Sequence, residues 1–561
     1  MGAGLELLSA ALIGAALVAL YSGPLRFDVF GVGLSVRTLS RPLTLAAVLI
    51  AARLWLQRGP SLATATFGTL ARIISTALVA AGILGWFVHL SPTCGGSDSY
   101  GYVSAAERLL DGELIADEPL APVLPFPYAI VAATPLGYAP TGRRPNASVP
   151  VYPLGLPMLM AAGARLFGPS AVFYVPPVLG IVLLIAGCLV AREWYHDRYV
   201  TLLACALLAL HPLVFTYSLQ PMSDVPAAAM LMIGVYGVSR LPPRPVIAGL
   251  AAALALMIRP ALAPAALALA IVPIVALGRR GVRAAAAYAA CVVAGSMLQA
   301  WTQWYLYGNA FTSGHGAVSS LFSLATFTVN LQSYARWGLL TMGPVWLAGL
   351  AVGLISSDRR PRFVLLIVAA GIGAPYLFYL PYDHWETLRF LLPVIAVATI
   401  ISAWGLLVVA RHVAGDAGGA LIAAIVAAAV GASWMAWLST NHVFEMPEHE
   451  ARHRVVGEIV GRTTADDAVI LALQHSGSLR YYAKRATINW DQIPPGAFRP
   501  TVQALQALGG DIFVMIDSAE ERAMFRARHG EVLEEDGWLP AGQWRNVQLL
   551  EAPPRSAPAR P

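Results

Sequence analysis

The chain has 561 residues, of which 57% are hydrophobic and 12% are charged, and its formal net charge at pH 7 is +6. Soluble globular proteins carry about 25% charged residues, so this composition excludes an ordinary soluble domain and indicates a polytopic membrane protein. The basic residues lie in short segments between apolar runs, as membrane orientation requires, which argues against nucleic acid as the partner of the positive charge.

Apolar runs that are long enough, or nearly so, to cross a bilayer recur along the chain, and from them we predict about 13 transmembrane helices. Arg259 and Pro260 interrupt one stretch, which we keep as two spans because the arginines downstream then alternate correctly. The runs lie at about residues 5–22, 41–57, 73–90, 172–191, 200–217, 224–240, 246–258, 261–277, 284–305, 338–356, 363–380, 390–410 and 419–438.

The arginines between these runs predict the orientation of the chain. If the N-terminus is cytoplasmic, every inside loop carries arginine, and a shift by one span would destroy this pattern. Of the 15 acidic residues that we count in residues 1–440, 10 then lie outside the cytoplasm. We therefore expect the polar chemistry on the extracytoplasmic side.

The first long outside loop, residues 91–171, is too long for a simple connection. Near its start, two glycines precede Asp98, and an amphipathic helix that carries Tyr102 follows. A carboxylate beside such a helix at a membrane surface suggests chemistry at the lipid–water boundary. The alternative is that Asp98 or Ser97 only caps the helix. Residues 149–159, which are apolar and broken by prolines, are expected to lie in the membrane interface.

The composition changes near residue 441, where charged residues become frequent and amphipathic segments alternate with short β-type runs. This pattern predicts a small extracytoplasmic α/β domain at 441–552 and a disordered tail at 553–561. We expect its strands near 468–473, 486–489, 511–516 and 544–550, and its helices near 476–483, 502–508 and 518–529.

Four stretches of the chain, together with its layout, resemble a known family. They are Asp98–Tyr102 continuing to Gly112, Tyr152–Pro157 continuing to Gly168, His211–Pro226, and Asp383–Pro393. They resemble the lipid-linked-sugar glycosyltransferases of the GT-C fold, in the bacterial branch related to protein O-mannosyltransferases and the lipid A aminoarabinose transferase. In the first stretch Asp98 is followed by Ser99, whereas the family has a second acid there.

The resemblance covers most of residues 70–440 and implies a GT-C-like catalytic core at 69–440, preceded by two additional transmembrane helices at 1–68. It also implies an enzyme of the bacterial inner (plasma) membrane. Such an enzyme moves a monosaccharide from a polyprenyl phosphate to an acceptor hydroxyl by an inverting displacement. The acceptor can be a protein, a lipid or a cell-wall glycan, and no metal or other cofactor is indicated.

The resemblance assigns Asp98 as the general base that takes the proton of the acceptor hydroxyl. Arg389 and Arg259 are candidates for holding the donor phosphate, because a guanidinium binds phosphate through two hydrogen bonds. The alternative for Arg389 is a salt bridge to Asp383 or Glu386, and the alternative for Arg259 is snorkelling to the interface.

Two further candidates for substrate binding, Asp224 and His315, each have a simpler structural interpretation as an alternative. Asp224 either caps the helix at its own position, which we favour, or forms a wall of the site. His315 is either a surface histidine, which we favour, or part of a loop that closes over the site. Five further candidates are Tyr100 and Tyr102 of the first long loop, and Asp383, His384 and Glu386 of one turn.

A rival from another class is a transporter or flippase of lipid-linked saccharides. Transporters commonly show inverted repeats and polar groups near the middle of the membrane. In this sequence we find no internal repeat, and the spans carry almost no charge in their middle. These observations favour an enzyme.

Overall fold

The structure is a computed structural model, and it describes residues 2–29, 32–36, 39–55 and 62–553. Apart from Pro553, the predicted tail at 553–561 lies outside these residues. The chain divides into two compact units. The first consists of Met1–Leu90, Tyr174–Gln299 and Leu321–Met446, and the second of Ser91–Phe173, Ala300–Ser320 and Pro447–Pro561.

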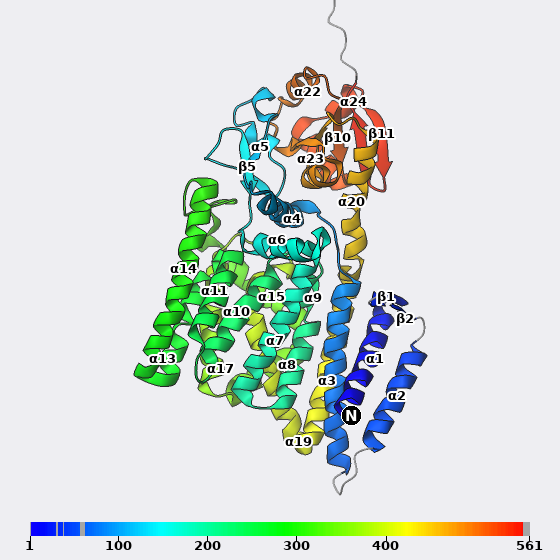
Figure 1. Cartoon of the computed structure of the whole chain (residues 1–561). Helices are drawn as coiled ribbons and strands as arrows, with labels where there is room; N and C mark the ends of the chain where they lie inside the picture. Colours follow the sequence, from blue (N-terminus) through cyan, green and yellow to red (C-terminus); the bar gives the residue numbers. More distant parts are fainter. Residues whose placement is uncertain (1, 30–31, 37–38, 56–61, 554–561) are drawn as a thin grey trace, which may run out of the picture. The chain divides into compact units, whose positions relative to one another are not determined.

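The first unit is built almost entirely from apolar helices (Figure 1). The helix α14 (Val282–Tyr307) begins in this unit and ends in the second. The others are α1 (Gly2–Ser22), α2 (Ser40–Trp55), α3 (Leu62–Val88), α7 (Val175–Tyr195), α8 (Arg198–Leu210), α9 (Pro212–Ser218), α10 (Asp224–Ser239), α11 (Pro245–Ile258), α12 (Ala263–Ala268), α13 (Ile271–Leu277), α15 (Phe327–Met342), α16 (Pro344–Ser356), α17 (Arg359–Val368), α18 (Ala374–Leu377) and α19 (Leu392–Thr440).

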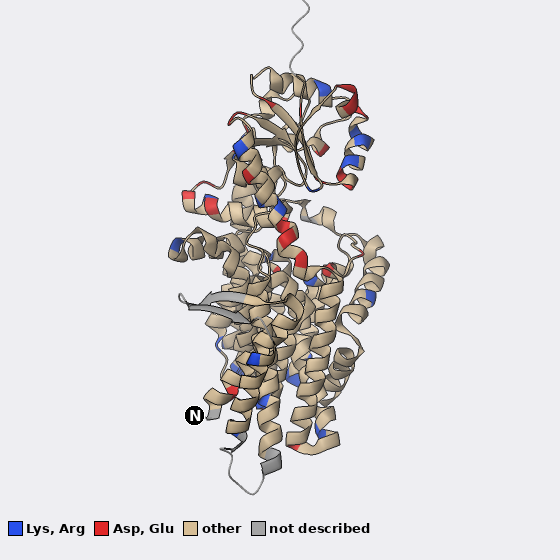
Figure 2. Cartoon of the chain, turned by 90° about the vertical axis from the view of Figure 1, so that its right-hand side faces the viewer, with Lys and Arg blue, Asp and Glu red and all other residues tan. Residues whose placement is uncertain are grey.

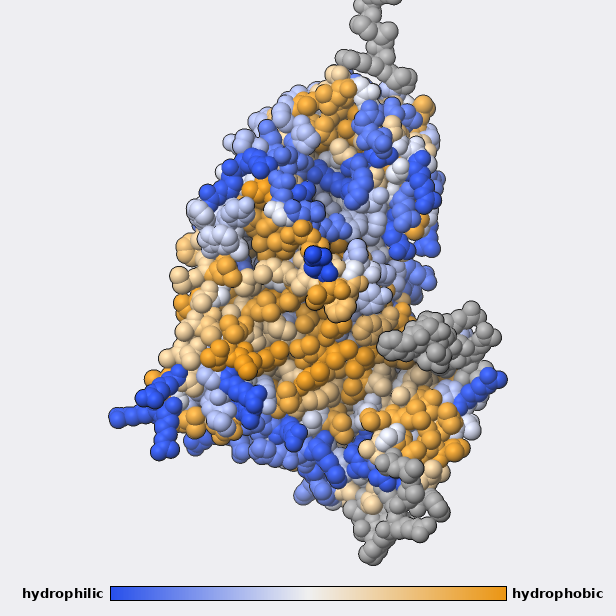
Figure 3. Space-filling view, in the orientation of Figure 1, coloured by the Kyte–Doolittle hydropathy of each residue, from blue (hydrophilic) through white to orange (hydrophobic). Residues whose placement is uncertain are grey.

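The helices of the first unit make this a multi-pass membrane protein. Among the described residues, six helices are long and apolar enough to cross a membrane, or up to eight if each of two sharply bent helix pairs forms one span. Figure 2 shows few charged residues along these helices, and Figure 3 shows a broad hydrophobic surface over them. The count of 13 spans remains a prediction, because α10 and α11 have only 16 and 14 residues, fewer than the ~20 that a span needs.

Two predicted spans, 390–410 and 419–438, correspond to one long element, α19. Its backbone leaves the helical conformation at Ala414 and Gly415, where Gly415 has a φ of +68°. Glycine adopts this left-handed conformation without strain. The break in the helix therefore lies between the two predicted spans, within residues 411–418.

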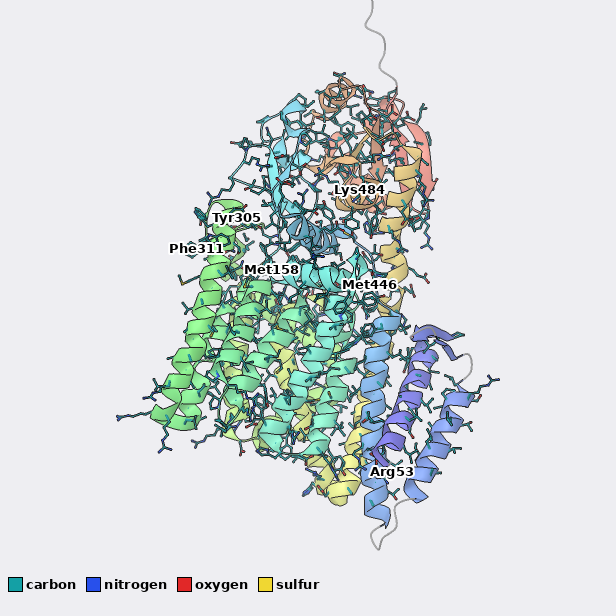
Figure 4. All side chains as sticks on the ribbon, viewed as in Figure 1. Arg53, Met158, Tyr305, Phe311, Met446 and Lys484 are labelled. Carbon is teal, nitrogen blue, oxygen red and sulfur yellow. The ribbon has the colours of Figure 1, made fainter. Side chains whose placement is uncertain are left out.

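The N-terminal helices pack on the rest of the first unit through small residues and one ionic cluster. A Cβ on Gly14 of α1 would lie 3.0 Å from the carbonyl oxygen of Ala77, so α1 and α3 approach closely. Glu6 accepts hydrogen bonds from Arg53 of α2 at 2.8 Å and from Arg72 of α3 at 2.9 Å. Arg53 is labelled in Figure 4. A β-hairpin that the sequence did not predict, β1 (Leu25–Val29) and β2 (Val32–Val36), follows α1.

The second unit contains a mixed five-stranded sheet in the order β11-β12-β10-β8-β9. The strand β8 pairs in parallel with both β10 and β9, while β12 pairs antiparallel with β10 and β11. The strand predicted near 544–550 corresponds to β12, and β11, which was not predicted, pairs with it as a hairpin. The strands are β8 (Val469–Leu471), β9 (Ala486–Ile488), β10 (Ile512–Ile516), β11 (Leu539–Trp544) and β12 (Val547–Glu551).

Five α-helices and a π-helical turn accompany this sheet. The three predicted helices correspond to elements among them, whereas the helices at Met446–Thr463 and Val532–Glu535 were not predicted. The predicted helix at 502–508 begins earlier, at Phe498. The elements are α20 (Met446–Thr463), α21 (Ser476–Ser478), η10 (Leu479–Ala483), α22 (Phe498–Gln506), α23 (Ala519–His529) and α24 (Val532–Glu535).

The loop at 91–171 is folded, and it shares one hydrophobic core with the sheet. Ala132 and Ala133 of the loop belong to the same buried cluster as Leu471 and Trp490. Arg480 donates hydrogen bonds to the buried carboxylate of Glu118, the shorter at 2.8 Å. The loop contains α4 (Gly96–Asp111), β3 (Ala116–Asp117), α5 (Ile130–Ala133), β4 (Tyr138–Pro140), β5 (Ala147–Pro150) and α6 (Gly155–Phe167).

Candidate functional site

Asp98 lies in the first turn of α4, in the second unit. The residue at the N-cap is Gly95, which has no side chain, so neither Ser97 nor Asp98 occupies the N-cap position that the alternative reading gave them. Asp98 instead accepts a hydrogen bond from the hydroxyl of Tyr152. The Ser97 hydroxyl lies 3.0 Å from the same Tyr152 oxygen. This hydrogen bond orients the carboxylate at the start of α4.

Tyr152 was not among the predicted site residues, although it begins the second family-like stretch. Its ring stacks on Tyr102, with 4.6 Å between the ring centroids. Burial, and then the negative charge of Asp98, raise the pKa of Tyr152. The phenol therefore stays protonated at neutral pH and donates to the carboxylate. Tyr102, a predicted substrate residue, supports Tyr152 from the next turn of α4.

Gly101 allows this arrangement because a side chain at position 101 would collide with Tyr152. A Cβ there would lie 2.5 Å from ring carbons of Tyr152 and 3.1 Å from the carbonyl oxygen of Gly137. We expect Gly101→Ala to displace the Tyr152 ring, to destabilise the protein by about 1–3 kcal/mol, and to lower activity. Thermal unfolding and turnover measure both effects.

Gly338→Ala is the matched control, because a Cβ at Gly338 has nothing within 4 Å. Alanine in this helix should be neutral or slightly stabilising. If Gly101→Ala behaves like Gly338→Ala in both assays, the close packing of Tyr152 on α4 is not needed.

His315 lies in the turn of a short hairpin, β6 (Thr312–Ser313) and β7 (Gly316–Ala317), and its side chain is exposed. Its ring centroid is 6.0 Å from that of Tyr152. Gly314 packs against Val151, where a Cβ would approach the Val151 Cα to 2.4 Å. The hairpin is therefore seated beside the Asp98–Tyr152 pair, which brings the predicted residue His315 to that pair.

The Tyr100 side chain packs at a different place from the Asp98–Tyr152 pair. It is buried, its ring lies 5.5 Å from that of Tyr138, and a Cβ on Gly477 would meet the Tyr100 ring at 2.4 Å. This side chain joins α4 to the residues before η10. A packing role accounts for these contacts, and we do not retain Tyr100 as a substrate residue.

The first unit brings together the two arginines predicted to hold phosphate. The Arg259 guanidinium lies 5.4 Å from the centroid of the Phe390 ring, and that of Arg389 lies 5.3 Å from the same centroid. Arg389 also lies 5.5 Å from the ring of Tyr217. Arg389 and Phe390 belong to the 3₁₀ helix η8 (Trp385–Leu391), whereas Arg259 follows α11. Two cations distant in sequence therefore meet at one aromatic ring.

Asp224 and Arg259 form a buried ion pair. Their side chains are 2% and 17% exposed, respectively. The residue at the N-cap of α10 is Ser223, without a side-chain hydrogen bond, and Asp224 is the first helical residue. The favoured readings of Asp224 as a cap and of Arg259 as a snorkelling side chain are thus both wrong. The pair holds the Arg259 guanidinium in a defined direction.

The three polar candidates before Arg389 lie in an exposed turn of the first unit. Asp383 accepts a hydrogen bond from the Trp337 indole at 2.8 Å and pairs with Arg336 at 3.4 Å. Glu386 lies 3.7 Å from Nδ1 of His384. Both carboxylates thus lie close to neighbouring polar side chains of the first unit.

A second titratable cluster lies in the second unit. The rings of His453 and His475 are 4.4 Å apart, and His475 Nε2 is 3.7 Å from Asp517 Oδ1. Glu521 accepts a hydrogen bond from the Asp517 amide, and burial raises the pKa of Glu521 to about 7. None of these residues was predicted as a site residue.

The Glu521 pKa predicts a pH-dependent stability. Between pH ~4.3, the ordinary glutamate pKa, and about 7, the folded state holds a proton that the unfolded chain has released. The stability from this proton is present below pH ~4.3 and is lost as pH rises through 7, a change on the order of 3 kcal/mol. Relative to wild type, Glu521→Gln should thus gain thermal stability at pH 8 and little at pH 4. The exposed neighbour Glu520→Gln is the control, and parallel pH profiles of wild type and Glu521→Gln would contradict the assignment.

Among the described residues, no group of three or more His, Cys, Asp or Glu side chains is placed to hold a metal ion. Tyr152 donates a hydrogen bond to Asp98, and Ser97, Tyr102 and His315 contact Tyr152 in turn. In the second unit Asp98 can accept a proton, and in the first unit Arg259 and Arg389 can bind an anion.

No protein-family model matches the sequence, and no curated protein matches it. Solved structures do match. ArnT from Cupriavidus metallidurans, crystallised bound to undecaprenyl phosphate, aligns with a TM-score of 0.53 and 12% identity over 84% of this chain and 97% of its own. The chain has the fold of ArnT. The apo form of ArnT aligns over the same shares with a TM-score of 0.50 and 11% identity.

ArnT is an enzyme of the GT-C fold, so the predicted resemblance is confirmed at the level of the fold. The archaeal oligosaccharyltransferase AglB from Archaeoglobus fulgidus, in complex with an inhibitory peptide and a dolichol-phosphate, also aligns. Its TM-score is 0.48 with 12% identity, over 83% of this chain and 72% of AglB.

Sequence reasoning missed two aromatic residues that contact the predicted site residues: Tyr152, which bonds to Asp98, and Phe390, which lies beside Arg259 and Arg389. Both lie inside stretches quoted for the resemblance, Tyr152–Pro157 and Asp383–Pro393. Each is an aromatic residue, a type that belongs as often to an interfacial belt or a core. Their roles follow from which charged side chains they contact.

Proposed function

We propose that this protein is a glycosyltransferase that moves a monosaccharide, hexosyl or pentosyl, from a polyprenyl-phosphate donor to an acceptor hydroxyl. The observation that carries the proposal is the meeting of Arg259 and Arg389 at Phe390. Two guanidiniums beside aromatic rings suit an anionic group attached to an apolar tail. The fold of ArnT, which binds undecaprenyl phosphate, supports the same ligand class.

In the proposed reaction Asp98 accepts the proton of the acceptor hydroxyl as its oxygen attacks the anomeric carbon of the sugar. The bond from this carbon to the phosphate oxygen breaks, and polyprenyl phosphate leaves with the electron pair. Arg389 and Arg259 stabilise the departing phosphate. A single displacement inverts the anomeric configuration, which NMR of the product would establish. Asp383, His384, Glu386, Tyr102 and His315 are proposed to contact the sugar or acceptor.

We further propose that the protein resides in a bacterial inner membrane with a cytoplasmic N-terminus. Extracytoplasmic residues would then include loop 91–171 and the segment 441–552. Arginine in every predicted inside loop supports this orientation. Cysteine labelling at a loop residue on each side, with a membrane-impermeant maleimide, tests it.

Arg389→Ala is expected to weaken donor binding by about 10- to 100-fold, because a hydrogen bond to a charged group contributes ~1.5–3 kcal/mol. Arg389→Lys should recover only part of this loss, since an ammonium lacks the planar fork of arginine. Equilibrium binding of a labelled polyprenyl-phosphate sugar measures both variants. Arg336→Ala is the control, because Arg336 pairs with exposed Asp383. Unchanged donor affinity in Arg389→Ala would remove this residue from the phosphate site.

The experiment that tests the proposed function is incubation of the purified protein with a panel of radiolabelled polyprenyl-phosphate sugars. We expect one donor to be consumed and polyprenyl phosphate to be released. Consumption of none, with intact sugar-lipid moving across the membrane of proteoliposomes, would instead establish the rival function, a transporter or flippase.

A further inference from the structure

The first unit contains an apolar cavity of about 310 Å³. Four segments line it: α1, α3, the second half of α19 and the region of α9. It therefore lies where the N-terminal helix α1 meets the rest of the unit. Representative lining residues are Ile13, Leu17, Leu78, Ala81, Ala428 and Met435.

The polar residues of this cavity gather at one end. Tyr21 and Ser22 end α1, and His89 directly follows α3. The Ser22 hydroxyl lies 2.6 Å from Nε2 of His89, and the His89 ring lies 4.8 Å from that of Phe444. The cavity thus has an apolar length that ends in hydroxyl and imidazole groups.

Two lining residues mark an open side. Ile425 is 53% exposed and Tyr21 is 41% exposed. Because α1, α3 and α19 are among the helices apolar enough to span a membrane, the medium at this opening is lipid. A cavity of this kind stays dry and takes up apolar molecules, and its volume lies at the lower end of the ~300–1,000 Å³ of ligand sites.

We propose that this cavity binds one acyl chain of a bilayer phospholipid, with the ester oxygens beside Tyr21, Ser22 and His89. The apolar lining matches a hydrocarbon chain, and hydroxyl and imidazole groups suit uncharged ester oxygens. The described lining residues include no Arg or Lys, so a polyprenyl phosphate would find no cation for its charged group. The bound acyl chain fills the space between α1 and the rest of the first unit. If this cavity were empty, the side chains that line it would lack packing contacts there.

This site is separate from the proposed donor site, since neither Arg259 nor Arg389 lines the cavity. It gives α1, which precedes the GT-C-like core, a function as one wall of a lipid site. The donor assay and the lipid assay below can therefore fail independently.

The test uses the full chain in nanodiscs of phosphatidylethanolamine and phosphatidylglycerol, with a phosphatidylcholine that carries a diazirine in its acyl chain. After illumination, mass spectrometry maps the adducts. We expect adducts concentrated around Ile13–Leu17 and Leu78–Ala81. Even labelling of these positions and of lipid-facing residues such as Leu45 and Val409, which are exposed, would overturn the proposal.

Ala428→Phe places a ring in the cavity, whereas Ala429→Phe, one residue along the same helix, does not line it and is exposed. We expect labelling at α1 and α3 to fall to background in the first variant and to persist in the second. Equal labelling of both variants would overturn the proposal.

Native mass spectrometry of the wild type needs no variant to fold. It should find one phospholipid retained per chain after extraction into mild detergent. Retention of a polyprenyl lipid, or of no lipid, would overturn the assignment of the occupant.

Discussion

Asp98→Asn should reduce turnover by about 10²- to 10⁴-fold, the usual contribution of a positioned general base. Asparagine has the same size and still accepts the hydrogen bond that the Tyr152 hydroxyl donates to Asp98. An amide cannot take up the proton of the acceptor hydroxyl, so the chemical step alone should suffer. Turnover and donor affinity are measured separately, and we expect affinity to change little.

Asp111→Asn is the matched control for this prediction. Asp111 is the last residue of α4 and is exposed, so it shares the helix with Asp98 but lies far from Tyr152 along it. Its variant should turn over like wild type. A wild-type rate in Asp98→Asn would exclude Asp98 as the base, and an equal loss in both variants would point to damage of α4.

Arg259→Ala should destabilise the folded protein by about 3–5 kcal/mol, because it leaves a buried carboxylate without its partner. That carboxylate is Asp224, which is 2% exposed. The double variant Arg259→Ala, Asp224→Ala removes both charges and should lose less stability than the single one. Thermal unfolding, followed by tryptophan fluorescence, measures the difference.

Arg259→Lys helps to separate stability from binding. Lysine keeps the positive charge beside Asp224, so much of the stability should return, whereas phosphate binding through a planar fork should not. Wild-type stability of Arg259→Ala would mean that water or another group compensates Asp224. In that case the buried pair would not be what orients Arg259.

The interpretation as a membrane protein follows from composition alone. Charged residues make up 12% of the chain, about half of the share in soluble globular domains. The strands at 469–471, 486–488 and 512–516 were also predictable, because each is a short apolar run bounded by turn residues. Local sequence patterns of this kind predict strands correctly where tertiary contacts do not override the local preference.

The number of spans and the partners of the charged residues were not predictable in the same way. Hydropathy does not say whether an interrupted apolar run such as 246–277 forms spans or shorter packed helices. Asp224 reads as a helix cap in sequence, since capping is a local signal. Its actual partner, Arg259, follows a different helix, α11, and no local signal reports such a pairing.

The sequence by itself determined the class of the protein, its apolar helices and the residue types that its proposed chemistry needs, because composition and periodicity are local properties. Only the tertiary structure decided that Tyr152 orients Asp98, that Arg259 and Arg389 share Phe390, and that α1 encloses a cavity with α3 and α19. These contacts join residues far apart in the chain. Close packing selects such pairs from many that the sequence allows.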